Sequence, residues 1–221
     1  MTDVVRSSNV GQVFPNFAPT NSLTTLMHGQ LGLPPHHDTA VLAWPARLAR
    51  FLAGWVTARH GEIGRGADQM EASFRSLQER KEQLYLTMLG TVLASTKLEM
   101  GRTEEALNFL EDVQLLSVET HQQLFIPDLH RLRAEALHRL DAKSPRIEQE
   151  YRTALQLARE QGALALELRA ASGLASCLAT SGRANEGTTL LRPVFDRFSE
   201  GLATPDLQAA KALLDALDQT S

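Results

Sequence analysis

A helix–turn–helix unit recurs along the chain between residues 44 and 199, and this repetition constrains the fold more than any other feature. Its clearest copy is LASTKLEMGRTEEALNFLEDV, from Leu93 to Val113. In this copy a small residue, Ala94, precedes a glycine turn at Gly101, and a second small residue, Ala106, follows on the next helix. Small side chains are needed where two helices cross closely, and glycine is favoured where the backbone reverses at positive φ. Four units spaced about 34 to 42 residues apart predict an all-α superhelix, or solenoid, of about four helix pairs.

The composition agrees with a helical fold and narrows the classes of partner. Hydrophobic residues make up 43% of the 221 residues, which is enough for a packed core. Good helix formers dominate after residue 40, and runs of β-branched residues are rare. The formal net charge is only −4, and charges of both signs alternate along the chain, as is typical of a solvated surface. We therefore expect no nucleic-acid partner.

No stretch of the sequence approaches 18 consecutive apolar residues, so we expect no membrane span and no membrane partner. The first residues lack the apolar core of a signal peptide. The single cysteine, Cys177, cannot form an internal disulfide, and we expect it to be a small buried hydrophobe in the run GLASCLAT. These features predict a cytoplasmic protein in a reducing compartment.

The chain divides into two parts. Residues 1–38 are rich in Asn, Ser, Thr, Pro and His, which predicts a flexible or partly ordered N-terminal segment. An alternative is that this segment occupies a groove of the domain that follows. Residues 39–218 are predicted to form the helical repeat domain. Its expected helices are residues 44–60 and 67–80, 82–100 and 103–118, 124–140 and 144–160, 163–180 and 183–198, and a final capping helix to residue 218.

Individual residues predict where these helices begin and turn. The dipeptide Trp44-Pro45 predicts the start of the first helix, since proline suits a first turn, and Thr204 predicts the cap of the last one. Pro193 is expected inside the eighth helix, where it removes one hydrogen bond. The turns between paired helices are expected at equivalent positions: Gly64, Gly101, the Asp141-Ala142 pair and Gly182. The aromatic residues expected in the core are Trp44, Trp55 and Tyr151.

The arrangement of Ala94, Gly101 and Ala106 resembles the skeleton of the tetratricopeptide repeat (TPR). The C-terminal half is similar to a narrower group, the TPR tail of bacterial signalling proteins that carry an adenylate/guanylate-cyclase-like domain and an AAA-type ATPase module. This resemblance covers roughly residues 50 to 218, and it is carried by the following segments: LHRLRAEAL from Leu129, YRTALQLAREQGALALELRAASGLA from Tyr151, and GRANEGTTLLRPVFDRFSEGLATPDLQAAKALLDAL from Gly182. It implies a TPR-like α–α superhelix that acts as a sensory or interaction tail.

The sequence departs from that group in three respects. It has no GxxxxGK[ST] phosphate loop, because the glycines of GEIGRGAD lack the lysine–hydroxyl ending. The cyclase and ATPase activities are therefore not carried over. Gly187 replaces the usual alanine, and the third unit has no turn glycine.

A charged cluster on the first helix of the third pair is the candidate binding site. Its members lie at i, i+4, i+7 and i+8, and Arg169 adds a cation from the next first helix. In TPR arrays the first helix of each pair lines the concave groove, and arginines there suit a carboxylate of a partner peptide. The alternative is a solvated helix face with internal Glu–Arg pairs. The candidate groove residues are Arg131, Glu135, His138, Arg139 and Arg169.

No combination of residues predicts catalysis, a metal ion or a cofactor. His36 and His37 are followed only by Asp38, too few ligands for a metal site. His60 and Glu62 lack a third orienting group. Cys177 has no base beside it in its helix.

These observations predict a non-catalytic protein–protein interaction module that holds a peptide or helix of a partner, such as a signalling protein, in its concave groove. Two alternatives remain. One is a small-molecule anion sensor that uses Arg131, Glu135, His138 and Arg169. The other is a self-associating solenoid that forms a homo-oligomer through an uncovered apolar end.

Overall fold

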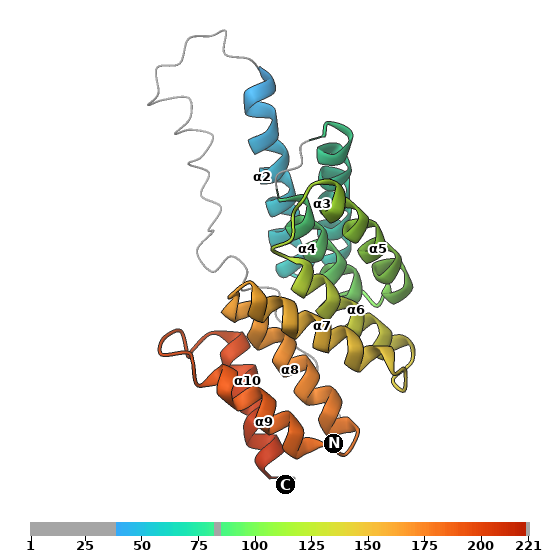
Figure 1. The fold of residues 1–221 in the computed structure, drawn as a ribbon. Coiled ribbons are helices and arrows are strands. Elements are labelled where there is room, and N and C mark those ends of the chain that lie inside the picture. Colours follow the sequence, from blue (N-terminus) through green and yellow to red (C-terminus); the bar gives the residue numbers. More distant parts are fainter. Residues whose placement is uncertain (1–38, 82–84, 220–221) are drawn as a thin grey trace. The chain divides into compact units, whose positions relative to one another are not determined.

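The computed structural model describes residues 39–81 and 85–219, and these residues form an all-α structure (Figure 1). Consecutive helices pack as sequential antiparallel pairs, which confirms the predicted helix-pair solenoid class. No described helix is both long enough and apolar enough to cross a bilayer. The nine helices in the described residues are α2 (Thr39–Arg59), α3 (Ile63–Glu79), α4 (Leu86–Glu99), α5 (Thr103–Glu119), α6 (Ile126–Leu140), α7 (Arg146–Glu160), α8 (Leu164–Thr180), α9 (Ala184–Phe195) and α10 (Pro205–Asp218).

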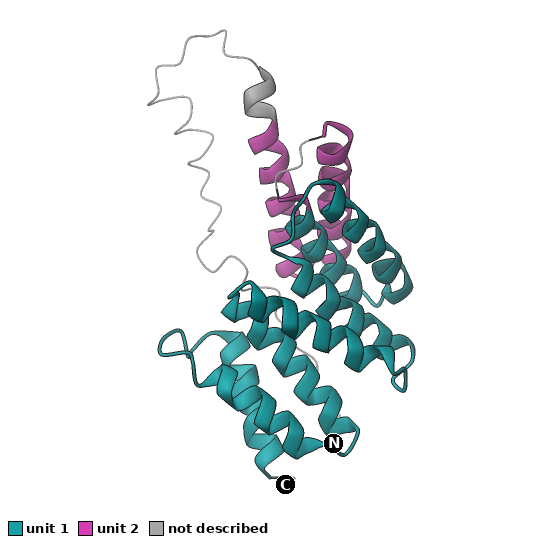
Figure 2. Cartoon of the chain, in the orientation of Figure 1, with its two compact units in different colours: residues 1–12, 87–221 teal, residues 13–86 magenta. Residues whose placement is uncertain are grey.

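The helices belong to two compact units, which Figure 2 distinguishes by colour. The smaller unit contains the α2–α3 pair, shown in magenta, and its buried side chains include Phe51, Met70, Phe74 and Leu77. The larger unit contains α4 to α10, shown in teal.

Close helix crossings at pairs of small residues define the repeat. In the smaller unit a Cβ atom added to Gly66 would lie 2.4 Å from the carbonyl oxygen of Gly54 and 2.5 Å from the backbone nitrogen of Ala58. A side chain of any size is therefore excluded there. An equivalent crossing occurs at Ala175 with Gly187, where an added Cβ would lie 3.0 Å from the Ala175 oxygen. Ala94 and Ala106, at the corresponding positions of the second helix pair, are both fully buried.

In each of these helix pairs, the turn glycine lies the same number of residues after the small residue on the first helix. Gly61, Gly101 and Gly182 have φ of +99°, +76° and +76°, a region that disfavours any residue with a Cβ atom. The prediction that Gly64 makes the first turn is wrong, because Gly64 lies inside α3 and Gly61 makes the turn. In the third pair Asp141 ends α6 with extended backbone at φ −147°, so no glycine is required there.

Two further boundary predictions have different outcomes. Pro45 does not start the first helix, because α2 begins at Thr39 and contains Pro45 in its interior. A proline near the beginning of a long helix removes only one backbone hydrogen bond, and the other turns continue. Thr204 does precede α10 as its N-cap residue, with extended backbone, but its side chain makes no capping hydrogen bond. Pro193 lies inside α9 as predicted.

The aromatic side chains differ in burial. Tyr151 is buried in the larger unit, where its ring occupies the space left by Gly173: a Cβ atom there would lie 2.3 Å from Tyr151 Cε1. Trp44 and Trp55 are only half-buried, so their assignment to the core is wrong. The Arg59 guanidinium lies 5.9 Å from the centre of the Trp55 ring, a cation–π contact that suits a half-exposed aromatic residue.

We predict that Gly66→Ala lowers the free energy of unfolding of the α2–α3 unit by about 2 kcal/mol, because its Cβ atom collides with backbone atoms that cannot move aside. Both tryptophans of the chain lie in α2, so urea unfolding followed by tryptophan fluorescence reports on this unit. Gly61→Ala is the matched control: it meets no atom within 4 Å and suffers only from its positive φ, with a loss of about 1 kcal/mol. An unchanged unfolding midpoint for Gly66→Ala would contradict the crossing.

Candidate functional site

The predicted groove residues of α6 form one hydrogen-bonded network. Arg131 Nε donates to Asp128 Oδ1 at 2.7 Å, and Arg131 Nη1 donates to Glu135 Oε2 at 3.1 Å. Arg139 Nη2 donates to the other oxygen of Glu135 at 2.6 Å, while its Nη1 donates to the carbonyl oxygen of Leu98 in α4. The Arg131 and Glu135 side chains are 12% and 18% exposed, so this network lies mostly below the surface.

Arg169 extends this set of charges to two more helices. It lies on α8, and its Nε donates to Asp206 Oδ2 in the first turn of α10 at 2.7 Å. Its charge also acts on Asp128 of α6. His138 is exposed and belongs to no part of this network among the described residues. Four of the five predicted residues are therefore associated, together with Asp128 and Asp206, which the sequence analysis missed.

Opposite charges keep this network ionised despite its burial. Burial by itself would raise the pKa of Asp128, but the charges of Arg131 and Arg169 and the hydrogen bond from Arg131 hold this pKa below its usual range. Burial likewise opposes the charged form of Arg131, but Asp128 and Glu135 raise its pKa. Burial, aided by the Glu135 carboxylate, raises the pKa of the neighbouring Tyr151. Each arginine thus already has a carboxylate partner, and a carboxylate of a partner peptide would have to replace it.

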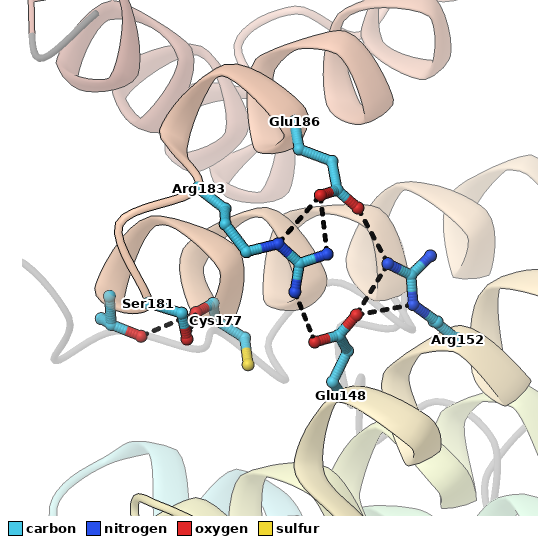
Figure 3. Close-up of polar contacts among 7 residues, drawn as sticks. Glu148, Arg152, Cys177, Ser181, Arg183 and Glu186 are labelled. Atoms are coloured by element: carbon cyan, nitrogen blue, oxygen red, sulfur yellow. Dashed lines mark hydrogen bonds and ion pairs between the residues drawn. The ribbon is translucent and has the colours of Figure 1, made fainter. Parts of the chain in front are cut away.

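A second, more exposed network joins α7 to the start of α9 (Figure 3). Arg152 donates to Glu148 at 2.8 Å and to Glu186 at 2.9 Å. Arg183 closes the ring by donating to Glu148 at 2.8 Å and to Glu186 at 2.6 Å. Because these side chains are between 31% and 47% exposed, water screens each pair and its contribution to stability is small.

Cys177 lies next to this ring (Figure 3). It is half-buried and packs against the core of the larger unit, so it is a small hydrophobic residue as predicted, although its burial is only partial. Burial and the Glu148 carboxylate raise the pKa of the thiol, against the opposing effect of Arg183 and Arg152. A raised pKa disfavours the thiolate, which is the reactive form of cysteine.

Glu167 joins α8 to α7 and to the segment that follows α9. Its side chain is only 3% exposed, and its two oxygens accept hydrogen bonds from Arg159 Nε at 2.9 Å and Arg197 Nη1 at 2.5 Å. Arg159 belongs to α7, and Arg197 follows the end of α9. Both arginines are about half exposed, so the buried partner is the carboxylate, and removing both cations would leave its charge without a partner in an apolar environment.

The outward face of α5 has a different character, since it is both apolar and acidic. Leu115 and Val118 are 65% and 63% exposed, and Leu124 in the following turn is 59% exposed. The helix TEEALNFLEDVQLLSVE contains no Lys, Arg or His, and its five acidic residues are all exposed. We call the following residues the α5 surface: Leu115, Val118, Leu124, Glu104, Glu111, Asp112 and Glu119.

The remaining candidates from the sequence do not form a site. His36 and His37, like the whole of residues 1–38, lie outside the described residues. His60 and Glu62 are both exposed, and Glu62 pairs with Arg65 at 3.0 Å. Among residues 39–81 and 85–219, no group of three potential metal ligands is arranged around a common point.

The fold and these surfaces define an all-α protein of sequential helix pairs, consistent with a helical repeat. A scan against models of known protein families and a search of curated protein sequences found no match to this chain.

We predict that Asp128→Asn lowers the free energy of unfolding by about 3 kcal/mol at pH 7, because it removes the nearer of the two carboxylates that balance the buried charge of Arg131 and leaves only Glu135. The pKa of Asp128 is lower in the folded chain than in the unfolded chain. Its stabilising effect is therefore complete above pH of about 4 and is lost as the pH falls through the folded pKa.

Urea unfolding followed by far-ultraviolet circular dichroism, at a series of pH values, checks this prediction. The difference between the wild-type chain and Asp128→Asn should narrow as the pH falls below about 4. Asp215→Asn is the control, since Asp215 is an exposed residue of α10 and its replacement should change stability by less than about 0.5 kcal/mol. A difference that is independent of pH would show that Asp128 is not charged in the fold.

Proposed function

We propose that this chain is a non-catalytic protein–protein interaction module of the TPR type, and that the α5 surface binds a basic amphipathic helix of a partner protein. The observation that carries the proposal is the presence of two large, exposed apolar side chains, Leu115 and Val118, on one face of a helix that has acidic residues and no basic ones. A contiguous apolar area with a polar rim is typical of an interaction site.

The apolar part of the α5 surface suits a helical partner. Leu115 and Val118 are three positions apart, so both lie on the same face of α5. Leu124 follows in the turn before α6. Burying these side chains under a partner yields about 25 cal/mol for each Å² of apolar area removed from water. A helix that presents apolar residues at i, i+3, i+4 and i+7 would supply the complementary row.

The charges of the α5 surface indicate the charge that a partner segment must have. Glu105 is engaged by Lys97 and lies 3.9 Å from Arg102. The other four carboxylates, those of Glu104, Glu111, Asp112 and Glu119, make no ion pair with any residue that the structure describes. Like charges on one helix face repel each other, and a basic partner relieves this repulsion. We therefore infer a partner segment rich in Lys or Arg on one side.

The resemblance to the TPR tails of bacterial signalling proteins supports a signalling protein as the partner. The predicted groove of Arg131, Glu135, His138, Arg139 and Arg169 stays a prediction. Because Asp128, Glu135 and Asp206 already occupy its arginines, we place the partner on the α5 surface instead.

We predict that the double substitution Leu115→Ser/Val118→Ser weakens partner binding at least tenfold, because it removes the centre of the apolar contact. A photo-reactive amino acid at Asn108, an exposed residue of α5, would first cross-link the partner in a cell lysate, and mass spectrometry would identify the attached segment. The affinity of the corresponding synthetic peptide is then measured by calorimetry at low and high salt. Binding should weaken as the salt concentration rises.

Leu202→Ser is the matched control, because Leu202 is similarly exposed, at 54%, but lies between α9 and α10. It should leave the affinity unchanged. An acidic or non-helical cross-linked segment would refute the proposed partner, as would an equal loss of affinity in Leu202→Ser. A cross-link only to a second copy of the chain would establish self-association in place of partner docking.

A further inference from the structure

The exposed face of α5 changes in character along the helix axis. A line of five exposed residues runs along this face, because its members follow each other at intervals of three or four positions: Glu104, Asn108, Glu111, Leu115 and Val118. The first three are polar and the last two are apolar. At a rise of about 1.5 Å per residue the line is about 21 Å long, and its apolar part begins about one turn after Glu111. The face is therefore acidic toward the start of α5 and apolar toward its end.

The acidic part of this face has charges left for a ligand. Two cations lie close to the start of α5, and both are directed at Glu105: Lys97 Nζ donates to its carboxylate, and Arg102 Nη1 lies 3.9 Å from it. Glu104 and Glu111 make no ion pair with any residue in the part of the chain that the structure describes. Their charges are therefore available to the cations of a bound helix.

The helix dipole indicates in which direction such a helix runs. The N-terminus of a helix is its positive end and favours acidic side chains, which agrees with Glu104 and Glu105 in the first turn of α5. In a partner helix the same effect favours basic side chains in the last turns. These two preferences meet face to face only when the helices run in opposite directions. A parallel partner would need its basic residues at its own positive end, where they destabilise it.

We propose that the partner helix binds antiparallel to α5, with apolar residues in its first two turns and Lys or Arg residues in its last two turns. This inference rests on the proposed function, because it concerns the helix that the α5 surface binds. From the partner residue opposite Val118, the next apolar residue falls about three positions later, opposite Leu115, and the first cation about seven positions later, opposite Glu111. The order of apolar and basic residues in a partner segment, as well as its composition, thus determines binding.

Two synthetic peptides of the same composition test this order. The first is a four-turn helix based on alanine and glutamine, with leucines in its first two turns and lysines in its last two, and the second has the reversed sequence. Calorimetry with the full-length chain should show that the first peptide binds at least about fivefold more tightly. Equal affinities, or tighter binding of the reversed peptide, would overturn the antiparallel orientation and leave the proposed function intact. No binding of either peptide would overturn both.

A nitroxide label on the first residue of the first peptide reports the direction of binding itself. In the antiparallel arrangement the label lies near the end of α5. It should therefore broaden the amide signals of Val118 and Glu119 in NMR spectra of the nitrogen-15-labelled chain, while those of Glu104 and Glu105 stay sharp. Broadening at Glu104 in place of Val118 would refute the orientation, whatever the affinity.

Matched variants of the chain locate the lysines of the peptide. Glu104→Gln/Glu111→Gln removes two charges from the exposed line and should weaken binding of the first peptide at least about fivefold. Asp196→Asn/Glu200→Gln is the control, because it changes the net charge equally at two exposed positions outside α5, and the affinity should stay within about twofold. Equal weakening by the two variants would indicate non-specific attraction and refute the placement of the lysines at the start of α5.

Discussion

The close approach of two helices at paired small residues is the constraint on which the rest of the structure depends. At Gly54 and Gly66 the helices are so near that backbone atoms occupy the place of a side chain, and Ala175 and Gly187 form a similar crossing. A crossing of this kind fixes the position of each helix along its partner, and thereby the side chains that face outward. The burial of Met70 and Phe74 in the smaller unit follows from it.

The third helix pair, α6 and α7, lacks a turn glycine, and contacts between side chains hold its helices together. His130 Nδ1 of α6 lies 2.6 Å from Glu150 Oε2 of α7, and the Tyr151 ring packs into the space above Gly173 of α8. The network around Arg131 lies next to Tyr151. The charges of Glu135 and Arg131 shift the pKa of the Tyr151 hydroxyl in opposite directions. Buried charges with complete sets of partners specify one arrangement of helices, because any other arrangement would leave a charge unsatisfied.

The spacing of small residues and apolar stripes was sufficient to predict the helix pairs, since these patterns are local. The first turn was misplaced because GEIGRG contains several glycines, and only the distance from Gly54 distinguishes Gly61 from Gly64. The contacts of Arg131 and Arg139 with Glu135 follow from helical spacing, but the contact of Arg169 with Asp206 joins residues 37 positions apart and could not be derived from a local pattern. The α5 surface did leave a signal, because Leu115 and Val118 fall outside the inward stripe of their helix.

Most charged side chains in the larger unit have opposite partners, as Glu167 has in Arg159 and Arg197. The α5 surface differs because acidic residues gather there, on a helix that contains no basic residue. Like charges on one helix face repel each other, and a basic helix that binds there would relieve this repulsion and stabilise the unit that contains α5.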